Sequence, residues 1–431
     1  MSVLALRTLR AASQRGLMGP AAAVFVSANI ANVANLLFNM IFARLMGPAA
    51  FADLTLLLTL KLGVLSFLGA LQFAFAEHVA KTPDLNTAKL KAHLLSARSL
   101  KLSIPIMFAL IALADFIASA LNFSSPLAFG LLALAIPFFL PMVIYRGLTQ
   151  GFIDIPKIIL SIQAEWIIRL VGSVILWRMG LGLPGIAVAV GLSILAGLFF
   201  STDKQDRSLS KQVPAGANPY ALKTLGFTAV PYLILQAAQV VVLDSDIIIA
   251  KAMFTPQTAG LVAGLILIQR IFFFAFLSCS TILQPYVARQ SGNGKPLKGL
   301  LTLLFAIVFM SAAALIIIVP NSELVVKIML GEDYAALASI VWISALTGAV
   351  FIASHLCAVY QIVRGQTFAA QTVLGFGVFQ LISLSAVNHF FPDMTLHSYF
   401  SLKLAVQILC ALCLITIVAW TSNKRVLERA A

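Results

Sequence analysis

Ionisable side chains lie inside stretches of this 431-residue chain that are otherwise apolar. The cations in such stretches are Lys61, Arg169, Arg270 and Lys403, and the carboxylates are Asp115, Glu165, Asp244 and Asp246. In the middle of a lipid bilayer each such group costs roughly 2.5–3.5 kcal/mol, so it is expected to face a partner or a water-filled cavity. These residues are therefore the first candidates for binding a charged solute or moving an ion.

Two of the cations, Lys61 and Arg270, have no acidic residue close to them in the sequence. If their helices take equivalent places in two halves of the protein, both side chains project into one cavity, where they attract an anionic substrate more strongly than in water. The alternative is that they pair with other helices or extend to the membrane surface. Glu165 and Arg169 lie four residues apart, so we expect them to pair with each other on one helix face.

Amide side chains form a second pattern. Asn29, Asn32, Asn35 and Asn39 fall within about 120° of one another around a helix. Gln236, Gln239 and Asp246 also share one helix face, whereas Asp244 lies on the opposite side. Several amides on one face are expected to point inward, either as a polar cavity wall or as hydrogen-bonding contacts between helices.

The elements that carry these residues are predicted to be membrane-spanning helices. Hydrophobic residues make up 61% of the chain and charged residues 10%, and a spanning helix requires about 20 apolar residues. The sequence therefore predicts an all-α polytopic membrane protein with twelve transmembrane helices. Their expected bounds are 19–43, 54–76, 102–121, 127–145, 158–178, 183–201, 225–250, 259–288, 299–320, 335–362, 367–390 and 396–420.

Lysine and arginine predict the orientation of these helices. They cluster at both termini and in every second loop, whereas the opposite set of loops contains Arg44, Arg178, Lys251 and Lys327. Because cytoplasmic loops are enriched in Lys and Arg, both termini are predicted to be cytoplasmic. The net charge of +14 then follows from topology. Anionic membrane lipids, rather than nucleic acid, are the expected partners of the basic loops.

The helices are expected to form two lobes of six, residues 1–201 and 225–431, joined by the polar cytoplasmic loop 202–224. Residues 41–48 and 248–256 both fit the pattern I-x-A-(R/K)-x-M followed by proline. Their separation of about half the chain indicates an internal duplication. Because each half has an even number of helices, the repeats would be related by an axis along the membrane normal, as in some transporters.

Several other functional classes are disfavoured. The loops are too short to form a folded catalytic domain on either side of the membrane, so no enzyme activity is expected. The chain lacks a GxxxxGK[ST] loop, so uphill transport would depend on an ion gradient, the membrane potential or consumption of the product outside. No metal or other cofactor is expected, because Cys279, Cys357, Cys410 and Cys413 all lie in apolar stretches without accompanying ligands.

Four segments resemble one family. Residues 35–54 (NLLFNMIFARLMGPAAFADL) and 243–265 (LDSDIIIAKAMFTPQTAGLVAGL) lie at the ends of the predicted first and seventh helices. Residues 331–335 (GEDYA) precede the tenth helix, and 146–157 connect the fourth and fifth. In this order, the segments resemble the polysaccharide transporter family, the Wzx-type flippases of the multidrug/oligosaccharidyl-lipid/polysaccharide (MOP) superfamily. The resemblance extends over nearly the whole chain.

The resemblance implies a MATE-like V-shaped fold, whose two lobes enclose a cavity that opens alternately to each side. It also implies that the chain moves a polyprenyl-diphosphate-linked oligosaccharide across the bacterial inner membrane for polysaccharide synthesis, beside a polymerase and export machinery. Lys61 and Arg270 would then attract the diphosphate, and the amide side chains would bind sugar hydroxyls. The candidates for ion coupling are Asp115, Glu165, Arg169, Asp244 and Asp246.

Two alternatives remain open. A cation-coupled efflux antiporter of the same superfamily is disfavoured by the lone cations, because cationic drugs require carboxylates. A membrane glycan polymerase or ligase is less favoured still, because enzymes of this kind that act on periplasmic substrates usually present a sizeable external loop.

Overall fold

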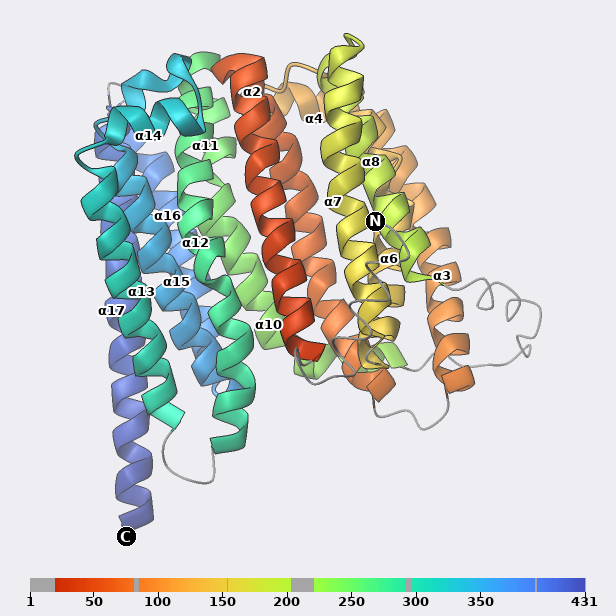
Figure 1. Ribbon diagram of the computed structural model, residues 1–431, viewed down its shortest axis with the longest axis vertical. Helices are drawn as coiled ribbons and strands as arrows, with labels where there is room; N and C mark the ends of the chain where they lie inside the picture. The colour runs from red at the N-terminus through yellow and green to blue at the C-terminus, as the bar shows by residue number, and fades with distance from the viewer. Residues whose placement is uncertain are drawn as a thin grey trace. The chain divides into compact units, whose positions relative to one another are not determined.

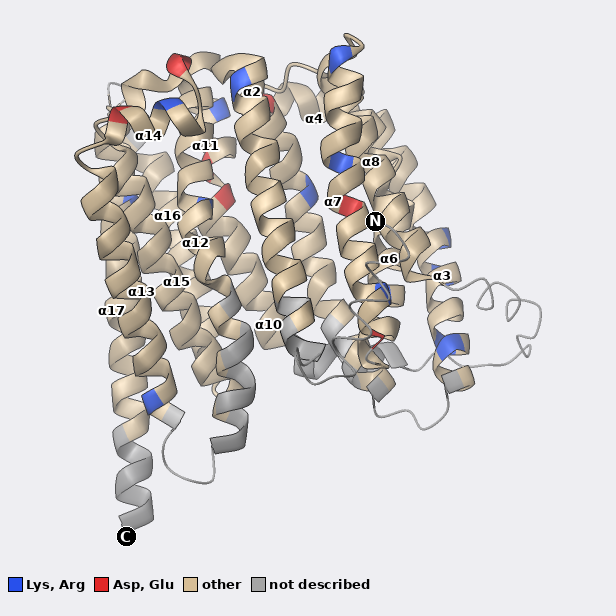
Figure 2. Ribbon diagram, in the orientation of Figure 1, with Lys and Arg blue, Asp and Glu red and all other residues tan. Residues whose placement is uncertain are grey.

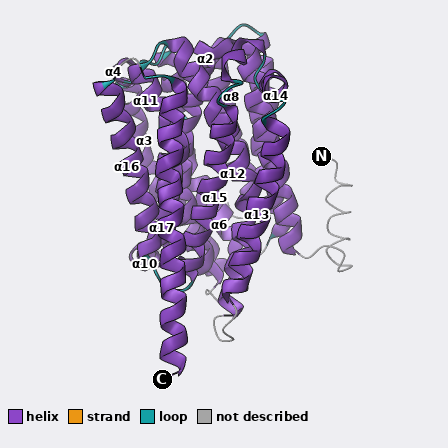
Figure 3. Cartoon of the chain, turned by 90° about the vertical axis from the view of Figure 1, so that its left-hand side faces the viewer, coloured by secondary structure: helices purple, strands orange, loops and turns teal. Residues whose placement is uncertain are grey.

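The computed structural model describes residues 20–80, 85–152, 154–202, 221–290, 296–391 and 394–430, and the regular elements in these ranges are all helices (Figures 1 and 3). The helices up to residue 202 are α2 (Pro20–Ala80), α3 (Leu85–Ala112), α4 (Ala114–Ala120), α5 (Pro126–Ala133), α6 (Ile136–Gly151), α7 (Ile155–Arg178) and α8 (Gly182–Ser201). Those that follow are α10 (Ala221–Asp244), α11 (Asp246–Met253), α12 (Pro256–Gln290), α13 (Pro296–Ile318), α14 (Ser322–Met329), the 3-10 helix η2 (Glu332–Leu337), α15 (Val341–Val363), α16 (Phe368–Phe390) and α17 (Leu396–Ala430).

These helices form two compact units that are not consecutive in sequence. Unit 1 comprises the described residues of Met1–Phe38 and Val64–Val230, and unit 2 those of Asn39–Gly63 and Pro231–Ala431. The middle of α2 therefore packs with the second half of the chain. The expected division into residues 1–201 and 225–431 stays a prediction, and most of the expected linker, residues 203–220, lies outside the described residues.

Ten of the described helices are long and apolar enough to cross a membrane, or eleven if the bent pair Pro126–Ala133 and Ile136–Gly151 is one span. One of the ten, Val26–Gln72, has 47 residues and would be about 70 Å long if it were straight, more than twice the hydrocarbon thickness of about 30 Å. It is interrupted at Gly47, where φ is 70° and ψ is 172°. The predicted number of twelve spans and the cytoplasmic termini stay predictions.

The interruption at Gly47 follows from two adjacent residues. A φ of 70° is open to glycine at little cost because it lacks a Cβ atom. Pro48 then disfavours helical geometry at the residue before it, yet suits the first turn of a new helix. Residues 20–46 are called here the first part of α2 and residues 48–80 its second part.

Three expected segments differ in detail from the structure. The predicted span 225–250 is divided at Ser245 into α10 and α11, and the predicted span 102–121 is divided between α3 and α4. The predicted span 127–145 comprises α5 and the beginning of α6, which are bent by 42°. Because a single irregular residue changes little in an apolar pattern, hydropathy alone does not reveal such breaks.

Candidate functional site

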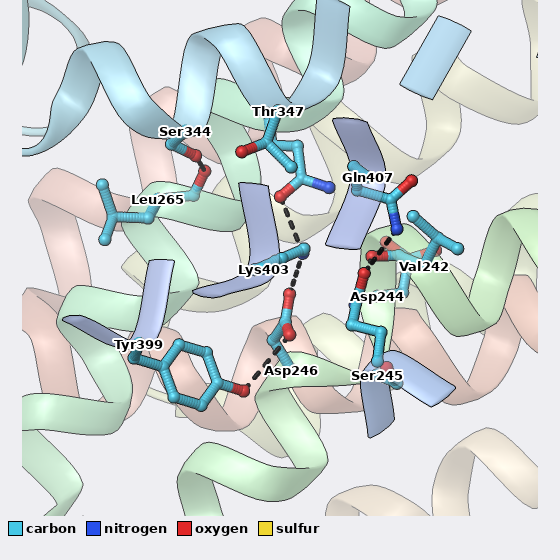
Figure 4. A network of polar contacts seen from close by, with 12 residues as sticks. Val242, Asp244, Ser245, Asp246, Leu265, Ser344, Thr347, Tyr399, Lys403 and Gln407 are labelled. Atoms are coloured by element: carbon cyan, nitrogen blue, oxygen red, sulfur yellow. Dashed lines mark hydrogen bonds and ion pairs between the residues drawn. The ribbon is translucent and has the colours of Figure 1, made fainter. Parts of the chain in front are cut away.

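The largest group of buried charges lies in unit 2, where Lys403 of α17 is paired with Asp246 in the first turn of α11. Both side chains have a relative exposure of 0%. Tyr399, one turn before Lys403, donates a hydrogen bond of 3.2 Å to Oδ1 of Asp246. Lys403 also donates to Oε1 of Gln269 in α12, at 2.8 Å. Figure 4 shows Lys403 and Tyr399 reaching the same carboxylate. Three helices, α11, α12 and α17, are thus joined through Lys403.

A second ion pair joins α10 to α12. Arg270 donates to Oδ1 of Asp244 at 2.5 Å and to the hydroxyl of Thr59, in the second part of α2, at 3.0 Å. The sequence offered no acidic partner near Arg270, and the structure supplies one from a neighbouring helix. The other carboxylate oxygen of Asp244, Oδ2, is buried and has no hydrogen-bond partner among the described residues. Asp244 therefore keeps one acceptor unused.

A third ion pair, between Asp53 and Lys251, joins the second part of α2 to α11. Both side chains are only 5% exposed. The sequence alone does not single out Asp53, because it lies at the edge of a predicted span, where an acidic residue is expected to contact water. The signal that could have found it is Lys251, a cation in an apolar segment that needs a counter-ion.

The buried charges of unit 2 do not cancel. Among the described residues, the buried cations are Lys61, Lys251, Arg270 and Lys403, and the buried carboxylates are Asp53, Asp244 and Asp246. Four cations and three carboxylates give a formal surplus of one positive charge. Lys61, which is 5% exposed, lies two residues beyond Thr59 in the second part of α2. The described buried side chains of unit 2 therefore carry a formal net charge of +1.

In unit 1, Glu165 forms an ion pair with a residue of another helix. Its carboxylate accepts a hydrogen bond of 3.0 Å from Arg146 of α6, which also donates to Ser161. Arg169 donates to Oδ1 of Asn35 at 3.1 Å, and its guanidinium lies 5.5 Å from the centre of the Phe38 ring. The ion pair between Glu165 and Arg146 thus links two helices, because tertiary packing brings α6 against α7.

The amide residues are divided between the two units. Asn29, Asn32 and Asn35 are half-buried in unit 1, whereas Asn39 is buried in unit 2. In α10, Gln239 is buried and its Oε1 accepts no hydrogen bond from the described residues, and Gln236 is half-buried. Sequence analysis missed a further amide chain in which Gln407 donates to Gln380 at 2.6 Å and Gln380 donates to the Val242 carbonyl at 3.3 Å.

Among the four carboxylates proposed for ion coupling, Asp115 is the one that the structure leaves exposed. It is exposed in the first turn of α4 rather than inside a continuous helix. A negative charge is stabilised there by the helix dipole. This position differs from that of Asp244, Asp246 and Glu165, each of which is paired with a cation from another helix.

No protein-family model and no characterised protein sequence matches the chain. Solved transporter structures do match its fold. A multidrug resistance MATE family transporter of the MOP superfamily, in an inward-facing conformation, has a TM-score of 0.79 at 13% identity, covering 91% of this chain and 95% of the other. An outward-facing structure of a multidrug resistance MATE family transporter of the MOP superfamily has a TM-score of 0.66 at 14% identity. The match covers 96% of this chain and 97% of the other.

A third similar structure is a MOP superfamily transporter from Pyrococcus furiosus, whose description states that the reverse polarity of its binding pocket suggests a different function. Its TM-score is 0.65 at 14% identity, and the match covers 94% of this chain and 96% of that one. Such low identities establish the architecture rather than the substrate. The chain has the all-helical fold of MATE transporters.

Proposed function

We propose that this chain is a MOP-superfamily membrane transporter that works by alternating access and whose substrate is an anionic, lipid-linked oligosaccharide. The observation that carries the proposal is the surplus of positive charge buried in unit 2. A diphosphate is attracted to such an interior because charge interactions are strong at low dielectric constant.

The pairing of the carboxylates supports an anionic rather than a cationic substrate. Asp53, Asp244 and Asp246 each have a cationic partner within unit 2. A cationic solute would have to compete with Lys251, Arg270 or Lys403 for them. The P. furiosus structure supports the idea that pocket polarity differs among transporters of this fold. A bacterial inner membrane, with polysaccharide polymerase and export proteins as partners, is the setting that this substrate implies.

The test is a translocation assay in proteoliposomes that contain the full chain. A polyprenyl-diphosphate oligosaccharide is placed in one leaflet, and its arrival in the other is scored by an external glycan-modifying enzyme. Lys61→Gln lowers the buried positive charge of unit 2 by one, and we expect it to reduce the initial rate at least tenfold. Lys101→Gln, at an exposed lysine of α3, is the matched control and should leave the rate unchanged.

A second pair of variants separates surplus charge from ion pairing. The double change Asp244→Asn with Arg270→Gln removes one charge of each sign, so the surplus persists and most of the rate should remain. If Lys61→Gln transports the oligosaccharide at the normal rate while the protein is present at the normal level, the cationic interior does not bind the substrate.

The alternative is a cation-coupled efflux antiporter, which the multidrug MATE structures support equally well. One observation favours it: Oδ2 of Asp244 is a buried acceptor to which no described residue donates, and it could accept a proton or a metal cation. This function requires that a cationic dye leave the vesicles in exchange for protons and that Asp244→Asn abolish the exchange. Dye exchange without oligosaccharide movement would replace the flippase proposal.

A further inference from the structure

A cleft in unit 1 is lined by α3, α6, α7 and α8 and has a volume of about 710 Å³. That volume lies within the range of about 300–1,000 Å³ that is usual for small-molecule sites. Phe138 and Tyr145 of α6 and Phe199 and Phe200 of α8 are among its lining residues. The cleft is therefore largely aromatic and aliphatic.

One wall of the cleft belongs to a surface that contacts lipid in a membrane. Phe199 is 59% exposed and Leu195 is 36% exposed, although both lie in the apolar span Gly182–Ser201. An apolar cleft that opens toward hydrocarbon is filled at least cost by a hydrocarbon chain, because polar groups would lose their water contacts there. The chemistry of the walls thus favours a lipid chain over a water-soluble solute.

The polar residues of the cleft gather near the N-terminal part of α3. His93 and Ser96 lie on this helix, and the His93 Nδ1 atom is 3.4 Å from the Tyr145 hydroxyl. Lys89 lies one turn before His93, so Lys89, His93, Ser96 and Leu100 form one stripe within about 60° around the helix. From Lys89 to Leu100 the stripe is about 16 Å long, half the thickness of the hydrocarbon.

The charge of α3 suits a phosphate group at this end. The helix contains Lys89, Lys91, Arg98 and Lys101, and its sequence contains neither Asp nor Glu. Figure 2 shows Lys and Arg along α3 without a neighbouring acidic residue on that helix. The positive-inside rule predicts that this end faces the cytoplasm, where anionic lipids are found.

We infer that the cleft is a binding site for an anionic membrane phospholipid, with an acyl chain between α3, α6 and α8 and the phosphate near Lys89. Lys91 and Arg98 are turned away from the stripe by about 160–180° and do not contribute. This lipid site does not depend on transport, so it can be tested separately from the proposed function.

The inference is tested by native mass spectrometry of the full chain in detergent, with phosphatidylglycerol and phosphatidylcholine of identical chains as probes. Phosphatidylglycerol should bind at least tenfold more tightly. Ala196→Phe fills the cleft and should weaken binding at least tenfold, whereas Ala112→Phe, at an exposed position of α3, should not. Lys89→Gln should weaken binding about fivefold, and Arg98→Gln should have no effect.

A diazirine on the acyl chain should label α3, α6 and α8, and each variant's thermal unfolding midpoint is measured to show that it is folded. Equal binding of both lipids, together with no effect of Lys89→Gln, would show that the site does not recognise an anionic headgroup. Unchanged binding and labelling in folded Ala196→Phe would show that the lipid does not bind in the cleft. Displacement by a polyprenyl phosphate at far lower concentration would replace the phospholipid with a substrate-entry site.

Discussion

Asp246 and Lys403 form a fully buried ion pair across 157 positions of sequence. Their pairing joins α11, which begins at the break near the end of the predicted span 225–250, to the last helix of the chain. Because Gln269 of α12 shares the ammonium group and Tyr399 shares the carboxylate, the pair is held from several sides. Buried ions remain charged only when they are paired and hydrogen-bonded in this way.

Replacing Lys403 with methionine should destabilise the protein strongly, because Asp246 would keep a buried charge without its partner. Breaking a buried pair costs about 3–5 kcal/mol. The free energy of unfolding in detergent measures the loss. The double variant Asp246→Asn with Lys403→Met removes both charges and should recover much of it. Equal stability of the single and double variants would show that the pair is not coupled.

The Asp53–Lys251 pair should behave differently under charge exchange. Either Asp53→Lys or Lys251→Asp alone places like charges together in the interior, whereas the exchange of both restores opposite charges. We expect the double variant to be more stable than either single one by about 1–3 kcal/mol, the usual size of coupling between contacting residues. A double-mutant cycle on unfolding free energies measures this coupling, and additive effects would contradict it.

Gly260 should tolerate no side chain. A Cβ atom there would lie 2.1 Å from the carbonyl oxygen of Pro48, and a backbone atom of this kind cannot yield easily. Gly260→Ala is therefore expected to cost at least about 1–3 kcal/mol, as forced overpacking does. The matched control is Gly375→Ala, because no described residue outside its own stretch of helix has an atom within 4 Å of its Cβ position.

Alanine at Gly375 should be neutral or stabilise α16 by about 0.5–1 kcal/mol, since glycine is unfavourable inside a helix. Thermal unfolding of the two variants side by side gives the comparison. A Gly260→Ala protein as stable as Gly375→Ala would mean that Gly260 of α12 does not pack closely against the backbone of Pro48.

Lys327 and Glu332 form an exposed ion pair with 2.6 Å between Nζ and Oε1. We expect this pair to be lost both at low pH and at high pH. The ammonium of Lys327 lowers the pKa of Glu332 below 4.5, so the pair is complete above pH 4.5 and is lost as pH falls through the lowered value. Glu332 raises the pKa of Lys327 above 10.5, so the pair is complete below pH 10.5 and is lost as pH rises through the raised value.

Glu332→Gln should return the pKa of Lys327 toward 10.5, because it removes the negative charge. Reductive methylation with a ¹³C label, followed by an NMR titration of Lys327, measures that pKa. Glu323→Gln, a change in the first turn of the same α14 helix, is the control and should leave the pKa raised. An unchanged pKa in Glu332→Gln would show that the two side chains do not pair in solution.

The sequence by itself determined the class of fold, because membrane helices are selected by local apolar length. Residues such as Asp246 and Lys403 could be identified as buried ions for the same reason, since a charge in an apolar run needs a partner. The breaks at Gly47 and Ser245 were harder to predict, because one irregular residue barely alters an apolar average.

Only the tertiary structure decided which partner each charge has. Helical spacing favoured Arg169 for Glu165, whereas the ion pair that the structure shows joins Glu165 to Arg146, because α6 packs on α7. Arg270 pairs with Asp244 across 26 positions of sequence, and Lys251 pairs with Asp53 across 198 positions. Helix packing sets these distances through side-chain shape along whole helices, and the short-range pattern around a charged residue does not contain that information.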